Sequence, residues 1–262
     1  MELIDEALGN LSNVLSGPRE MALDIICDYI EDADADPQWL VETLLPMLKE
    51  KCRLNIKGEQ SDDVFTRTFA IEVLACLVGR DHDSNLLSVA QRKELVAFTQ
   101  RYLEDETDFR GYVSVEHGWA HSIAHAADLT NALIKNTYID TSELLSLFDS
   151  WQELLKSAKL PFLMFDEDQR IAMALKSAVD NGRMNALKLA VFFDELLDDE
   201  EDDWFHLAFR SATALNRFKN SQNLIRSLFL QIQLDKRTTP DSDVLTVLRG
   251  LLRKLDAGFY PG

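Results

Sequence analysis

The chain has 262 residues, of which 46% are hydrophobic and 27% charged, the balance of an ordinary globular protein. Its 27 Lys and Arg residues stand against 45 Asp and Glu residues, so the net charge is −18, and such a surface repels nucleic-acid phosphates and anionic lipids. We therefore expect no nucleic-acid partner and no membrane partner, and the 10 Gly and 6 Pro residues are too few for a turn-rich all-β protein.

Almost every segment, taken in chain order, has the 3.6-residue hydrophobic period of an amphipathic helix. The expected helices begin near residues 18, 37, 61, 90, 116, 141, 167, 185, 204, 221 and 240. One helix about every 20–25 residues, and so one hairpin about every 40–50, is the period of HEAT-type repeats. We predict an all-α fold with a single domain over residues 1–262. The predicted architecture is a stack of antiparallel helix hairpins, a HEAT-like α-solenoid or α-α superhelix.

Several of these helices have recognisable start signals. Asp36-Pro37 and Thr239-Pro240 each place a capping residue before a proline at the first helical position. Asp140-Thr141-Ser142-Glu143 is a capping box, and Asp166 is the expected cap of the next helix. The acidic run from Asp194 to Asp203 has no EF-hand spacing, so we interpret it as a solvated turn between helices.

The three cysteines and the amino terminus bear on the compartment. Cys27, Cys52 and Cys76 are widely spaced and form no Cys-x-x-Cys pair, so we expect neither a zinc knuckle nor a disulfide framework. Cys27 and Cys76 lie among Ile, Leu and Val, so we expect them to be free thiols in a core. The acidic start at Met1 has no signal-peptide pattern, and no apolar stretch reaches the ~20 residues of a membrane span. We therefore predict a cytoplasmic protein.

The segment from Arg110 to Asp128 holds the densest group of polar residues. A single helix over this segment would put four side chains on one stripe, namely His117, His121, His125 and Asp128. The opposite face would then be buried, and it consists of Trp119, Ile123, Ala126, Thr130, Leu133 and Ile134.

Such a stripe has the ligand types of a divalent metal site. His121, His125 and Asp128 could supply two neutral imidazoles and a carboxylate, with a position left for water. Glu116 is the candidate catalytic base at the start of the helix. The same face could instead bind a small polar ligand without metal, or form a hydrogen-bond network with no ligand at all. All three interpretations stay open at this point.

Arginines within apolar helical segments are a second feature, because a buried guanidinium needs a carboxylate or an anionic ligand. Arg67 and Arg226 have this setting, and the partners that we expect are Glu116, Asp128 or the acidic residues beginning at Asp166. The candidate ligand-binding residues are Arg67, Arg110, Tyr112, Glu116, Trp119, His121, His125, Asp128, Glu167, Arg170 and Arg226.

Five motifs together resemble a bacterial family catalogued as domain of unknown function 2785. They are Val64-Phe65-x-Arg67-x-Phe69, Arg110-Gly111-Tyr112, Gly118-Trp119-Ala120-His121-x-x-Ala124-His125-x-x-Asp128, Asp166-Glu167-Asp168-x-Arg170 and Arg226-Ser227-Leu228. His117 lies outside this pattern. The resemblance implies an all-α fold and a shared polar cluster, and because it brings no activity, function must come from the site.

Three functions are therefore considered. The leading hypothesis is a cytoplasmic helical repeat protein whose His, Asp and Arg side chains line a concave pocket for a small polar ligand or a divalent metal. The second is a protein-interaction scaffold that binds a peptide or partner in its groove, with a purely structural polar cluster. The third is a metal-dependent hydrolase, which needs a water-bearing metal at the same residues.

Overall fold

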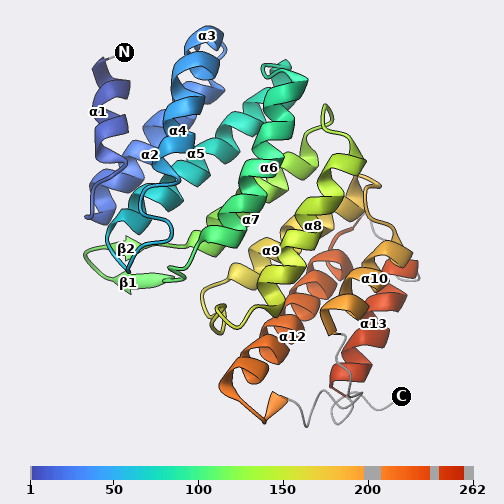
Figure 1. Cartoon of the computed structure of the whole chain (residues 1–262). Helices are drawn as coiled ribbons and strands as arrows, with labels where there is room; N and C mark the ends of the chain where they lie inside the picture. Colours follow the sequence, from blue (N-terminus) through green and yellow to red (C-terminus); the bar gives the residue numbers. More distant parts are fainter. Residues whose placement is uncertain (1, 198–207, 237–241, 257–262) are drawn as a thin grey trace. The chain divides into compact units, whose positions relative to one another are not determined.

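A computed structural model describes residues 2–197, 208–236 and 242–256 of the chain (Figure 1). The described residues are mostly helical, which confirms the prediction from the hydrophobic period, and two short strands form one small sheet. None of the described helices is both long enough and apolar enough to cross a membrane. The chain separates into two compact units, residues 1–147 and 148–262.

The first unit consists of helices and one β-hairpin. In chain order its elements are α1 (Glu2–Asn10), α2 (Ser16–Glu31), α3 (Pro37–Trp39), the π-helical turn η1 (Leu40–Leu44), α4 (Leu45–Lys51), α5 (Asp63–Ser84), α6 (Val89–Asp105), β1 (Tyr112–Ser114), β2 (Gly118–Trp119) and α7 (Ser122–Lys135). The strands are antiparallel, with Tyr112 opposite Trp119. In Figure 1 they lie at the lower ends of α2 and α5.

Helix α5 is the centre of this unit, because it packs against α2, α4 and α7. Residues 64–71 of α5 are buried without a break, as expected of a helix that is enclosed on all sides. Helix α6 packs against α7 in turn. The polar side chains that α5 carries are therefore enclosed by its neighbours and need partners among them.

The second unit is built around α12. Helix α8 (Thr141–Lys156) begins in the first unit and ends in the second, and it is followed by α9 (Glu167–Asp180), α10 (Ala186–Leu197), α12 (Ala212–Gln233) and α13 (Asp243–Leu255). Helix α12 packs against α9 and α13, and α10 packs against α13.

The predicted helix starts are mostly found, but the start near residue 221 is wrong, because α12 begins at Ala212 and continues through that position. The backbone N–H of Gln38 donates to the Asp36 carboxylate at 2.9 Å, which caps α3 as expected. Asp166 precedes α9 but has a left-handed backbone (φ 66°), and its carboxylate accepts from the side chain of Gln169 rather than from a backbone N–H. The acidic run begins inside α10, and its residues 198–203, like Thr239-Pro240, lie outside the described residues.

The expectation that Cys27 and Cys76 are free thiols is wrong, because they form a disulfide that joins α2 to α5. Their Cα atoms are 5.8 Å apart, and 49 residues separate them in sequence. A pairing at that distance depends on how two helices pack, which spacing alone does not reveal. Cys52 is a free, buried thiol. Disulfides are rare in reducing compartments, and the cytoplasmic location stays a prediction.

Candidate metal site and its surroundings

A β-hairpin occupies the position where one helix was expected. Helix α7 begins only at Ser122, and His117 lies in the turn between the strands, so the prediction that it shares a helical stripe is wrong. Two backbone conformations prevent a continuous helix, since Gly118 has φ 64° and His121 has φ 55°. His121 is the residue that precedes α7, and only His125 and Asp128 of the predicted stripe are within the helix.

Arg19 of α2 holds this hairpin in place. Its side chain is fully buried, with the guanidinium 4.2 Å from the ring centroid of Phe65 and 4.5 Å from that of Phe69. One terminal nitrogen donates to the backbone oxygens of His117 and Trp119, at 2.5 and 3.3 Å. Burial lowers the pKa of Arg19 to about 10 against the opposing charge of Glu20, so the side chain remains charged at neutral pH.

The predicted buried face of this segment is only partly buried. Ile123 and Leu133 are buried as expected, but 38% of Trp119 is exposed, which corrects the prediction for that residue. Trp119 belongs to β2 instead of a helix, so helical spacing does not determine its direction. Its ring meets those of Tyr112 and His121 edge to face, with centroid distances of 5.0 and 4.3 Å.

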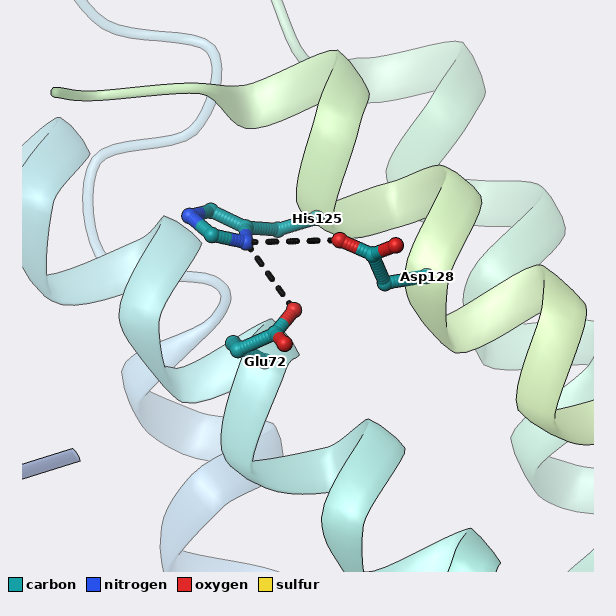
Figure 2. A group of neighbouring side chains, drawn as sticks. All are labelled: Glu72, His125 and Asp128. Atoms are coloured by element: carbon teal, nitrogen blue, oxygen red, sulfur yellow. Dashed lines mark hydrogen bonds and ion pairs between the residues drawn. The ribbon is translucent and has the colours of Figure 1, made fainter. Parts of the chain in front are cut away.

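The cluster with metal-ligand chemistry consists of Glu72 from α5 and His125 and Asp128 from α7 (Figure 2). His125 Nδ1 lies 2.9 Å from Glu72 Oε2 and 3.8 Å from Asp128 Oδ2. The three ligand atoms are all within 4.8 Å of one another. The cluster is largely enclosed, since the exposed fractions of the side chains are 23% for Glu72, 11% for His125 and 16% for Asp128.

The two carboxylates control the protonation of His125. Burial alone would lower its pKa, but the hydrogen bonds and charges of Asp128 and Glu72 outweigh burial and raise the pKa from 6.5 to about 9. At neutral pH His125 is therefore an imidazolium whose Nδ1–H points to a pair of carboxylates. Its ring also packs edge to face on Phe69, at 5.5 Å between centroids.

The structure groups His125 and Asp128 with Glu72, whereas the sequence grouped them with His121. The His121 ring lies beside His125, at 5.9 Å between centroids, and is largely buried. Glu72 was missed because periodicity does not identify a partner on another helix. One signal was available, since Glu72 is the only charged residue between Arg67 and Arg80 and a charge inside an apolar helix needs a partner.

The predicted arginines have carboxylate partners other than those expected. Arg67 forms a buried two-point ion pair with Glu106, with both distances at 2.9 Å. Arg110 is paired with Asp108 at 2.7 Å, and it also donates to the backbone oxygen of Ser61. In the second unit Arg226 is paired with Asp256 at 2.7 Å. The expectation that Glu116, Asp128 or the 166–168 segment would pair with these arginines is wrong. Their carboxylate partners are Glu106, Asp108 and Asp256.

The remaining candidate residues are not among the three residues of the cluster. Tyr112 is 41% exposed, and the Glu116 side chain is exposed while its backbone oxygen accepts from the backbone N–H of Ser16. Glu167 and Arg170 belong to α9 in the second unit. Glu167 is buried, which raises its pKa, and its carboxylate accepts from the backbone N–H of Phe165 at 2.7 Å.

Comparison with known families assigns the chain. A family model described as a protein of unknown function (DUF2785) matches residues 53–230, more than half of the sequence. The chain belongs to this family. The range matched to DUF2785 includes Glu72, His125 and Asp128 and the whole β-hairpin. No curated protein and no solved structure matches the chain. Membership in DUF2785 confirms the resemblance and brings no activity.

Proposed function

We propose that this DUF2785 protein binds a divalent metal ion through Glu72, His125 and Asp128. The observation that supports the proposal is the convergence of three ligand atoms, from two helices, within 4.8 Å of one another. Ligand atoms bound to one ion at about 2.1 Å lie roughly 3–4 Å apart. Of the two distances from His125 Nδ1, the one of 3.8 Å is in that range and the one of 2.9 Å is just below it.

The charge of the cluster supports the same proposal. With His125 neutral, two negative charges lie in a largely enclosed position, and enclosed charge of one sign is unfavourable without compensation. A proton on His125 compensates one of the two charges. A divalent ion would compensate both, and this supports a metal at the cluster.

The donor set indicates which ions to expect. One imidazole nitrogen with two carboxylates suits Zn²⁺, Mn²⁺ or Fe²⁺. It suits copper(I) less well, because that ion prefers thiolate ligands, and Ca²⁺ less well, because that ion prefers oxygen ligands alone. Three protein ligands leave at least one coordination position for water or a small polar ligand. A metal-dependent hydrolase would use that water, and Glu116 stays the sequence-based candidate for its base. The HEAT-like stacking of hairpins also stays a proposal, supported in the first unit by the succession α2, α5 and α7.

A second candidate function is a protein-interaction scaffold in which the cluster is structural. The internal ion pairs of Arg67, Arg110 and Arg226 favour it, because they leave these arginines with partners inside the chain. In that case the hydrogen bond between His125 and Glu72 ties α7 to α5 and needs no ion.

Isothermal titration of the metal-stripped protein with Zn²⁺, Mn²⁺ and Mg²⁺ tests the proposal. We expect one ion per chain, Mg²⁺ weakest, and a loss of at least about tenfold in affinity for Glu72→Gln, His125→Asn or Asp128→Asn. His82→Asn and Asp83→Asn on α5 change the same residue types outside the cluster and should bind as the wild type does. If no ion binds, or if the variants in and outside the cluster behave alike, the metal proposal fails. Lowered stability in the cluster variants without metal binding would favour the scaffold.

A further inference from the structure

The first unit also contains a pocket whose lining differs in chemistry from the Glu72–His125–Asp128 cluster. It has a volume of about 220 Å³ and is lined by Arg53, Ile56, Phe98, Arg101, Tyr102 and Asp105. The last four residues follow the i, i+3, i+4, i+7 spacing of one face of α6. The other wall is the segment that follows α4. None of these residues belongs to the Glu72–His125–Asp128 cluster.

The charge of this pocket is unusual for so acidic a chain. Within the described residues neither Arg53 nor Arg101 forms an ion pair, whereas Arg67, Arg110 and Arg226 each have a carboxylate partner. The one carboxylate in the lining, Asp105, is paired with Lys57 at 2.7 Å and so is already neutralised. Two uncompensated guanidinium groups therefore face a small pocket in a protein with a net charge of −18.

The rest of the lining is apolar and uncharged. Phe98 and Tyr102 are almost fully buried, and the guanidinium carbon of Arg53 lies 5.1 Å from the centroid of the Phe98 ring. Burial raises the pKa of the Tyr102 hydroxyl, which keeps that wall neutral. A bare phosphate or sulfate would gain little from this apolar lining, whereas an aromatic ring could pack against it.

We propose that this pocket binds a small aromatic carboxylate, with the ring against Ile56 and Phe98 and the carboxylate between Arg53 and Arg101. A guanidinium matches a carboxylate through two parallel hydrogen bonds, which an ammonium cannot reproduce. The volume of about 220 Å³ equals about seven water-sized groups at about 30 Å³ each. This is the size range of benzoate, because covalently bonded atoms lie closer together than separate water molecules.

Titration of the full chain with benzoate, followed by NMR shifts, tests this assignment. We expect saturable binding that weakens as salt rises, and neutral benzamide and inorganic phosphate should each bind at least about tenfold more weakly. Arg101→Ala removes an exposed side chain, so the fold should persist while benzoate affinity falls about tenfold or more. Lys135→Ala, an exposed charge on α7, is the matched control and should bind normally.

Three results would overturn the assignment: equal binding of benzoate and benzamide, tighter binding of phosphate than of benzoate, or unchanged benzoate affinity in Arg101→Ala. Arg53→Lys provides a second variant, because it keeps the positive charge but loses the two-point geometry. Its benzoate affinity should fall while its circular dichroism spectrum stays that of the wild type.

Discussion

The protonation of His125 is controlled by two neighbouring carboxylates, those of Glu72 and Asp128. Burial opposes a charge on the imidazole, but each carboxylate accepts a hydrogen bond from the protonated ring and attracts its positive charge. Together the two carboxylates outweigh burial and raise the pKa of His125 to about 9. A residue that binds a proton more tightly in the folded state than in the unfolded state makes stability depend on pH.

The free energy of unfolding should therefore fall as pH rises from 6.5 to 9 in the metal-stripped protein. The unfolded chain loses its His125 proton near 6.5, whereas the folded chain keeps it to about 9, so the stabilisation is complete below 6.5 and lost above 9. A shift of this size corresponds to at most about 3 kcal/mol. Urea unfolding at several pH values measures the slope. His125→Gln should lose it and His82→Gln should keep it, whereas equal slopes in both variants would contradict this account.

Arg19 illustrates what sequence analysis does and does not provide at the scale of residues. Apolar segments with a single charge, such as those around Arg67 and Glu72, can be recognised in the sequence as needing partners. Arg19 lies in a polar stretch next to Glu20, and nothing there indicates a buried guanidinium. Its partners are the nearby backbone oxygens of Asn13 and Val14, and also backbone oxygens and aromatic rings from about 50 and 100 residues away, which the local sequence does not reveal.

At the scale of elements, the β-hairpin decides the site. A regular α7 beginning before His117 would place three histidines on one face, but the left-handed residues Gly118 and His121 redirect the chain just before the helix. The helices themselves were predictable because their apolar residues repeat at 3.6. The hairpin was not predictable, because its strands Tyr112–Ser114 and Gly118–Trp119 are too short to show alternation.

Gly118→Ala should destabilise the protein by about 2–4 kcal/mol. Its φ is 64°, and an added Cβ would lie 2.7 Å from the Cβ of Ser16, so backbone strain and a collision with α2 combine. Gly182 has a similar φ of 69° with nothing within 4 Å, so Gly182→Ala isolates the strain and should cost about 1–2 kcal/mol. Urea unfolding compares the two variants, and equal losses would mean that the contact with Ser16 has no effect.

On the scale of the whole molecule, the Cys27–Cys76 disulfide closes a loop between α2 and α5 with a sequence separation of 49 residues. In the chain-entropy account a disulfide that closes a loop of that length raises the free energy of unfolding by about 4 kcal/mol, because the bond lowers the conformational entropy of the unfolded chain. Helix α5 carries Glu72 one turn before Cys76, so the bond also fixes the helix that supplies one of the proposed ligands.

Reduction should therefore lower the melting temperature, and a Cys27→Ala/Cys76→Ala variant should melt at the lower temperature with or without reductant. Thiol titration in denaturant gives an independent check, since only Cys52 should react before reduction and all 3 cysteines afterwards. Three reactive thiols in protein purified without reductant would show that the bond does not form.

The contacts of Arg19 also determine how small a working fragment can be. The match to DUF2785 begins at residue 53, yet the turn that precedes α7 is held by Arg19, and α5 is tied to Cys27. Both anchors lie upstream of the matched range. The range that matches the family model should therefore not fold stably by itself. An expression fragment that begins at residue 53 would contain all three proposed ligands but would lack the two residues that anchor the helices carrying them.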